Sequence, residues 1–170
     1  MNWLGGLVQK LVTESDTVLD LGCGIMTAID GLKYKSYLGV DVWMPYLEHI
    51  KHKQNVLQMD VTENLEQFLD DSYDVVLCLD LLEHLELKQA DYVLSHLNRI
   101  CRKKSIIFTP SKFDTNIEAT KNAWDLGECS FQTHKCLIPR ELLYKKQYSI
   151  RTDNTDGGYF GVFNKNGNHV

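Results

Sequence analysis

Short apolar runs alternate with amphipathic segments along the first 110 residues. Residues 17–21 hold Val18, Leu19 and Leu21 and predict a short buried strand that ends in a glycine turn. Tyr73–Leu79 is the most continuously apolar segment, which is typical of a central strand covered on both faces. The same patterns predict further strands at 36–41, 55–60 and 104–109, and helices at 27–32, from Pro45, at 65–69 and at 88–101.

This order of elements predicts an α/β fold. Strand and helix alternate five times, so a Rossmann-like, doubly wound parallel sheet with right-handed crossovers follows. After a helix that starts at Pro139, strands at 148–152 and 159–163 flank Asp156, Gly157 and Gly158. They predict an antiparallel C-terminal hairpin at the sheet edge, which brings the sheet to seven strands.

The predicted domain covers residues 1–170 as one unit. Apolar residues recur at helical spacing in the first dozen positions, so residues 1–15 are expected to form an amphipathic helix that packs on the domain. Residues 111–139 are polar, irregular and too long for a simple connection, which favours a substrate loop or lid.

Charge and composition exclude several classes of function. The chain has 18 basic and 23 acidic residues, a net charge of −5, so binding to the nucleic-acid backbone is not expected. Five cysteines without dense spacing, and no signal-type segment, indicate a reducing cytoplasm. No apolar run is long enough to cross a membrane, and the sequence does not indicate an oligomeric state.

Three aspartates lie at the ends of consecutive predicted strands, namely Asp20, Asp41 and Asp60. Open α/β sheets bind ligands at the carboxyl ends of strands, where the strand order reverses. Asp41 follows the glycine turn by about twenty residues, the spacing of a carboxylate that binds ribose hydroxyls. Each aspartate alone is also a common loop cap, but three in register beside a glycine turn favour a ligand site.

A nicotinamide dinucleotide fits these residues less well. Its fingerprint needs a third glycine at the position of Thr27, and Asp20 would lie beside a pyrophosphate. The Tyr-x-x-x-Lys pair of many reductases is also missing after the fourth strand. A ligand with adenine, ribose and a positively charged amino-acid end accounts for all three carboxylates.

At these motifs the chain resembles the class I S-adenosylmethionine-dependent methyltransferases, in particular the methyltransferase type 11 group, over residues 16 to 163. The resemblance rests on the stretches 18–24, 37–41, 58–61 and 73–85. It implies S-adenosyl-L-methionine as the cofactor, with Gly22 and Gly24 against its methionine part and Asp20 near its amino group. It assigns to the cofactor Asp20, Gly22, Cys23, Gly24, Asp41, Val42, Asp60, Val61, Cys78 and Leu79.

Asp80, Glu83 and His84 are the candidate catalytic residues. Their spacing of i, i+3 and i+4 would place them on one face if the segment after the fourth strand is helical. A base in this position could remove a proton from an oxygen or nitrogen nucleophile. The Asp-x-x-Glu-His pattern also resembles ubiquinone-biosynthesis O-methyltransferases, which implies a metal at these residues as an alternative; capping or packing is a further one.

Trp124, Phe131 and His134 are expected to contact the substrate from segment 111–139. Cys129, His134 and Cys136 lack a CxxC pair and an obvious fourth ligand, so no metal site is predicted there. Cys23, Cys78 and Cys101 are expected to be small buried residues.

These expectations favour a methyltransferase that acts on oxygen or nitrogen of a small-molecule acceptor. Leu79, Asp80, Leu81 and Leu82 stand where an Asp/Asn-Pro-Pro-aromatic motif would favour nucleic-acid bases. The family often has a third glycine where Met26 stands, and the first crossover is short. A catalytically silent cofactor-binding subunit that supports a partner protein is therefore the alternative.

Overall fold

The structure is a computed structural model, and it describes residues 3–50, 55–153 and 157–167. Its described strands form one seven-stranded sheet in the order β3-β2-β1-β4-β5-β7-β6. The first five are parallel, and β7 is antiparallel to β5 and β6. The strands are β1 (Thr17–Leu21), β2 (Ser36–Asp41), β3 (Val56–Gln58), β4 (Tyr73–Leu79), β5 (Cys101–Pro110), β6 (Ser149–Asp153) and β7 (Gly158–Asn164).

Short helices and 3-10 turns connect these strands. The α-helices are α1 (Trp3–Gln9), α2 (Met44–Ile50), α3 (Leu87–Ile100), α4 (Ile117–Lys121) and α5 (Arg140–Lys145). The 3-10 turns are η1 (Thr27–Ile29), η2 (Leu65–Gln67), η3 (Leu82–His84), η4 (Ala123–Asp125) and η5 (Ser130–Gln132).

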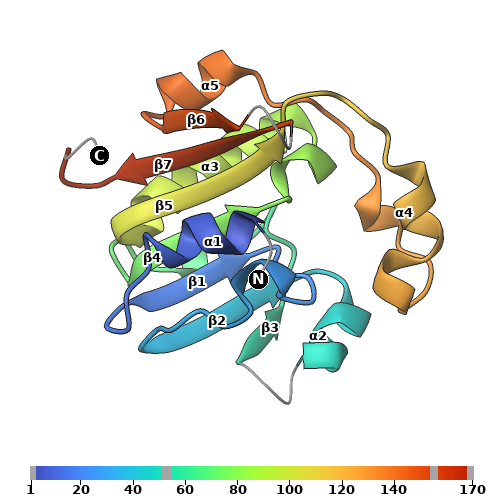
Figure 1. The fold of residues 1–170 in the computed structure, drawn as a ribbon, viewed down its shortest axis with the longest axis horizontal. Helices are drawn as coiled ribbons and strands as arrows, with labels where there is room; N and C mark the ends of the chain where they lie inside the picture. Colours follow the sequence, from blue (N-terminus) through green and yellow to red (C-terminus); the bar gives the residue numbers. More distant parts are fainter. Residues whose placement is uncertain (1–2, 51–54, 154–156, 168–170) are drawn as a thin grey trace.

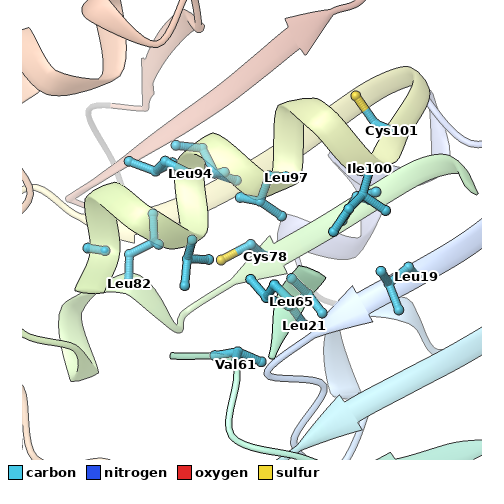
Figure 2. Packing of buried hydrophobic residues seen from close by; sticks show 14 of the residues in the cluster. Leu19, Leu21, Val61, Leu65, Cys78, Leu82, Leu94, Leu97, Ile100 and Cys101 are labelled. Atoms are coloured by element: carbon cyan, nitrogen blue, oxygen red, sulfur yellow. The ribbon is translucent and has the colours of Figure 1, made fainter. Parts of the chain in front are cut away.

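Two helices mark the opposite faces of the sheet, α1 in front and α3 behind in Figure 1. Because side chains of a strand alternate between faces, Leu19, Val76 and Ile107 pack under α3, whereas Val75 and Ile106 pack toward α1. Figure 2 shows side chains of α3 directed onto β1 and β4. This core fixes the strand ends at which the cleft is built.

The α3 helix explains how local sequence supports the fold. Apolar residues at spacings of three and four bury one face completely. Its first turn has a capping box, in which Glu86 and Gln89 satisfy each other's backbone N–H groups. Removing a fully buried side chain such as Leu97 would cost about 2–5 kcal/mol.

Some predicted elements differ from the observed ones. The helix expected at 65–69 is only the 3-10 turn η2. The segment after the fourth strand, which would place Asp80, Glu83 and His84 on one face if it were helical, forms only the 3-10 turn η3. Asp80 adopts a left-handed conformation with φ of 53°, which interrupts any helix there. The N-terminal helix ends at Gln9 rather than spanning 1–15.

The C-terminal hairpin is observed as predicted, and β7 lies between β5 and β6. Strand β6 is shifted by one residue from the prediction, and β7 is one residue longer at each end. Asp156 of its predicted turn lies outside the described residues.

Segment 111–139, here named the cap, has more regular structure than expected. It contains α4, η4 and η5, and it arches from the end of β5 toward α2 (Figure 1). Ala123 and Cys129 of the cap pack with Tyr46 of α2. Within the part of the chain that the structure describes, no helix has the length and apolar character needed to cross a bilayer.

Candidate active site

A cleft of about 340 Å³ lies at the carboxyl ends of β1, β2 and β4, under the cap. The strand order reverses between β1 and β4, and ligands bind at such a switch point in open α/β sheets. Of the residues predicted to form the site, the cleft is lined by Asp20, Gly22, Cys23, Gly24, Asp41, Val42, Asp60, Val61, Leu79, Asp80, Glu83, His84, Trp124, Phe131 and His134.

The glycine turn after β1 is held by Asp41. The two carboxylate oxygens of Asp41 accept hydrogen bonds from the backbone N–H groups of Gly24 and Trp43, each at 2.9 Å. Gly22 has φ of +73°, and a Cβ atom there would lie 2.9 Å from Leu81. A side chain at this position would therefore strain the backbone and push against the turn after β4.

Asp20 is the buried carboxyl group of the cleft, with 4% of its surface exposed. The hydroxyl of Tyr37 donates a hydrogen bond of 2.9 Å to its Oδ2 atom. Burial raises the pKa of Asp20 to about 7, although the Tyr37 hydrogen bond favours the ionised form. Burial likewise raises the pKa of Asp41, against its backbone hydrogen bonds.

Asp60 has a different environment from the other two aspartates. It is exposed, and its Oδ1 atom accepts hydrogen bonds from the N–H and hydroxyl of Thr62 at 2.8 and 2.7 Å. These bonds shape the loop that presents the buried Val61 to the cleft. Asp60 is thus both a loop cap and a wall of the cleft.

Cys78 does not line the cleft. Its side chain is fully buried between α3 and the sheet, as Figure 2 shows, whereas the next residue, Leu79, lies on the cleft side. The alternation of side chains along β4 separates the two residues. Cys78 therefore has a packing role in this structure.

Glu83 and His84 lie in η3 at the other end of the cleft. Glu83 is buried, and its Oε2 atom accepts a hydrogen bond of 3.0 Å from the Thr109 hydroxyl. Burial and the nearby Asp80 raise the pKa of Glu83. Asp80 itself is exposed at the cleft mouth, and the surrounding low-dielectric walls raise its pKa.

His84 is held in one tautomer by the cap. Its Nδ1 atom lies 3.3 Å from the carbonyl oxygen of Thr133, and a carbonyl oxygen only accepts hydrogen bonds. Burial and the neighbouring His134 lower the pKa of His84 to about 4, so the ring is neutral near pH 7. With Nδ1 as donor, Nε2 keeps a lone pair that can accept a proton or bind a cation.

The cap brings three aromatic side chains to the cleft. The ring of His134 lies 4.8 Å from that of His84, edge to face. Trp124 and Phe131 stand at the rim, with 57% and 47% of their surfaces exposed. Trp124 has φ of 53°, which is rare for a bulky residue, and the Asn122–Gly127 loop holds it there.

Glu83, His84 and His134 together have the donor set of a metal site. Their ligand atoms all lie within 4.8 Å of one another. Backbone and hydroxyl partners on His84 and Glu83 resemble the outer-shell support of metal ligands. Asp80, which the sequence pattern places beside Glu83 and His84, is outside this group, and His134 takes its place.

Sequence reasoning missed several residues of the cleft. Trp43 and Tyr46 line it from the start of α2, and Lys135 lines it from the cap. Tyr37 does not line the cleft but binds Asp20 from the core, and its position inside β2 gave it the pattern of a core residue. The aromatic pair Trp43 and Tyr46 directly after Asp41 was a usable signal, but nothing near Lys135 in the sequence predicts its place.

Solved structures with similar folds include methyltransferases. A SAM-dependent methyltransferase from Archaeoglobus fulgidus superimposes with a TM-score of 0.66 and 16% identity over 95% of this chain and 94% of that one. Magnesium protoporphyrin IX methyltransferase (ChlM) from Synechocystis PCC 6803, solved with bound SAH and with bound SAM, has a TM-score of 0.62. Its SAH form is 17% identical over 95% of this chain and 80% of that one. The predicted Rossmann-like fold class is confirmed.

The chain belongs to the methyltransferase domain family, whose model matches residues 19–109. The predicted family is thereby confirmed, and S-adenosylmethionine is the cofactor of homologous methyltransferases. A ubiquinone biosynthesis O-methyltransferase from Rickettsia bellii is 32% identical over 123 residues, 65% of this chain and 45% of that protein. The uncharacterized protein MJ0638 from Methanocaldococcus jannaschii is 28% identical over 58% of this chain and 42% of its own length. The chain therefore spans less than half the length of these curated relatives.

Proposed function

We propose that this chain transfers a methyl group from S-adenosylmethionine to an oxygen or nitrogen atom of a small organic acceptor. The observation that carries the proposal is a single cleft with two chemically different ends. Asp20, Asp41 and the glycine turn form one end, and the neutral, oriented His84 lies at the other.

The acidic end suits the cofactor. S-adenosylmethionine supplies a methyl group on a sulfonium centre, so the protein has to bind, orient and, for a protonated acceptor, remove a proton. Each carboxylate oxygen of Asp41 keeps a second lone pair after binding a backbone N–H, and these lone pairs can accept ribose hydroxyls. Asp20 provides a buried carboxylate for an ammonium group.

The other end suits the acceptor. In this proposal His84, which lines the cleft and has its Nδ1 bound to the Thr133 carbonyl oxygen, uses Nε2 to take the proton of the attacking oxygen or nitrogen. Trp124 and Phe131 of the cap would provide flat apolar surface for an organic molecule. His134 is at contact distance from His84 and narrows this end. The combination of a base and flat apolar walls supports a small organic acceptor.

Calorimetry followed by a transfer assay tests the proposal. S-adenosylmethionine and S-adenosylhomocysteine are expected to bind, and NADH is not. Radiolabelled methyl transfer is then measured on a panel of catechols, carboxylic acids and amines. Binding of NADH without either sulfur ligand would contradict the proposal, and cofactor binding without any transfer would favour the catalytically silent subunit.

One observation favours a metal-assisted form of the same reaction. Glu83, His84 and His134 together could hold a divalent cation, which would lower the pKa of an acceptor hydroxyl. The Rickettsia bellii relative is an O-methyltransferase, which is consistent with an oxygen acceptor. Metal analysis of the purified protein compares His134→Gln with Asp80→Asn: loss of metal only in His134→Gln supports this form, and metal-free, chelator-insensitive wild-type activity contradicts it.

A further inference from the structure

Asp20 is a buried charged residue in an otherwise apolar strand. Its neighbours in β1, Leu19 and Leu21, are fully buried. Placing a carboxylate in such surroundings is costly unless a donor satisfies it, so its retention needs an explanation. The observed donor is the hydroxyl of Tyr37, a residue with only 4% of its surface exposed.

Gly39 makes this contact possible. In the parallel register Val18 pairs with Tyr37 and Asp20 pairs with Gly39, so Tyr37 must reach two residues along the strand to meet Asp20. A Cβ atom at Gly39 would lie 3.0 Å from the Tyr37 hydroxyl oxygen and 2.9 Å from the Cys23 sulfur. The missing side chain leaves the passage through which the hydroxyl reaches the carboxylate.

Among the charged and titratable groups around Asp20, Tyr37 is the one that favours its ionised form. Asp41 at the end of β2 opposes ionisation of Asp20 through charge repulsion. Burial raises the pKa of the Cys23 thiol in the turn and of the Cys78 thiol in β4, so both stay neutral. Burial also raises the pKa of Tyr37, which keeps its hydroxyl hydrogen available for donation.

We propose that Tyr37 is a positioning residue of the cofactor site, whose hydroxyl reaches past Gly39 to hold Asp20 as an ionised acceptor for the ammonium group of the cofactor. Tyr37 binds Oδ2, and among the described residues Oδ1 has no hydrogen-bond partner, so this second oxygen is available at the cleft. This inference rests on the proposed function, since it needs a cofactor with an amino-acid end.

The test is the pH dependence of S-adenosylhomocysteine binding, measured by calorimetry for the wild type and Tyr37→Phe. Wild-type affinity should rise with pH as Asp20 ionises and then reach a plateau. Loss of the hydroxyl should move the midpoint of this rise in affinity upward by about one pH unit. At pH values below the midpoints of both proteins, the variant should therefore bind about tenfold more weakly than the wild type. The two affinities should converge on the plateau.

Three controls separate positioning from structural support. 5′-Methylthioadenosine lacks the amino-acid end, so its affinity should not differ between the two proteins at any pH. Tyr148→Phe removes another fully buried hydroxyl, which bonds Ser105 at 2.7 Å outside the cleft, and should leave the midpoint unchanged. In an Asp20→Asn background, Tyr37→Phe should have no further effect.

The outcomes are distinguishable. If the wild type does not bind S-adenosylhomocysteine, both the proposed function and this inference fail. If it binds but Tyr37→Phe leaves the midpoint in place, or weakens binding equally at every pH, only the inference is overturned. If Tyr37→Phe does not fold, the pH dependence of S-adenosylhomocysteine binding is measured for Asp20→Asn instead. An unchanged midpoint in that variant would show that Asp20 does not cause the pH dependence and would overturn the inference.

Discussion

The two ends of the cleft are built from different kinds of contact. At the end where we propose that the cofactor binds, here the cofactor end, Asp20 and Asp41 belong to neighbouring strands, and sheet hydrogen bonds fix their separation. At the end proposed for the acceptor, here the acceptor end, His84 comes from a three-residue turn and His134 from the cap fifty residues later. Two backbone hydrogen bonds from Lys135 and Cys136 to the Glu83 carbonyl oxygen, at 2.8 and 3.3 Å, join these segments.

This difference predicts different responses to mutation. Strand ends are over-determined by the sheet, so changes there should affect stability and cofactor binding together. The acceptor end depends on a few loop contacts, so changes there should affect transfer while leaving the fold and the cofactor in place. Each prediction below can break this distinction.

The largest effect is expected for His84→Gln. If His84 accepts the proton of the acceptor, kcat should fall by about 10²–10⁴-fold while S-adenosylhomocysteine affinity stays unchanged. His49→Gln, on the exposed side of α2, is the matched control and should retain full activity. Steady-state kinetics and calorimetry measure both quantities; a parallel loss of cofactor affinity would show that the two ends are not separate.

A pair of glycine variants tests the cofactor end. Gly22 and Gly24 both have positive φ, but a Cβ atom at Gly22 would lie 2.9 Å from Leu81, whereas one at Gly24 would meet nothing within 4 Å. Gly24→Ala should lower the free energy of unfolding by about 1–2 kcal/mol through strain alone. Gly22→Ala should lose about 1–3 kcal/mol more from overpacking. Urea unfolding without ligand measures both, and equal losses would contradict the Leu81 contact.

Opposite pH effects on stability are expected from the two ends. The folded-state pKa of His84 is about 4, below its ordinary value of 6.5, so the unfolded chain binds the proton first as pH falls. The contribution of His84 to the free energy of unfolding is complete above pH 6.5 and is lost as pH falls toward 4. Asp20 has a folded-state pKa of about 7, above 3.8, so its contribution decreases as pH rises from 4 to 7.

Thermal unfolding of two variants separates these effects. Relative to the wild type, His84→Gln should remove a rise of stability with pH between 4 and 6.5, and Asp20→Asn should remove a fall between 4 and 7. If stability changes with pH in the variants as it does in the wild type, the two side chains are not buried as described.

The smallest effect is expected for Trp124→Gly. Because Trp124 is 57% exposed and has φ of 53°, glycine should relieve about 1–2 kcal/mol of backbone strain against an entropy cost of about 0.5–1 kcal/mol, so the free energy of unfolding should rise slightly. KM for the acceptor should rise, with the cofactor affinity unchanged. A destabilised variant would mean that the ring is needed to hold the cap.

The sequence predicted the cofactor end better than the acceptor end, for physical reasons. Asp20, Asp41 and Gly22 lie in or directly after short apolar runs of strand length that are visible along the chain, and parallel pairing brings the ends of these strands together. The doubly wound parallel sheet followed from the alternation of strands and helices, and the C-terminal hairpin followed from the two late strands that flank Asp156 to Gly158. Cys78 was misplaced because a continuously apolar strand gives no sign of which face looks toward the ligand.

The acceptor end could be predicted only in part. Glu83 and His84 were selected by residue type and spacing, on the condition that their segment is helical. The structure meets this condition only over the three residues of η3, because Asp80 takes a left-handed conformation that the local sequence does not predict. His134 was expected at the substrate, yet its contact with His84 depends on how the cap folds back over fifty residues. Such contacts depend on tertiary packing rather than on periodicity.

The position of β7 has a consequence for the order in which the domain is assembled. This strand follows β6 along the chain but lies between β5 and β6 in the sheet, where all seven of its residues pair with β5 and five of them also pair with β6. Until β7 emerges from the ribosome, β5 has an unpaired edge and β6 has no neighbour in the sheet. Completion of the sheet therefore waits for the synthesis of residues 158–164, and a nascent chain cut before Gly158 would expose a strand edge that favours aggregation.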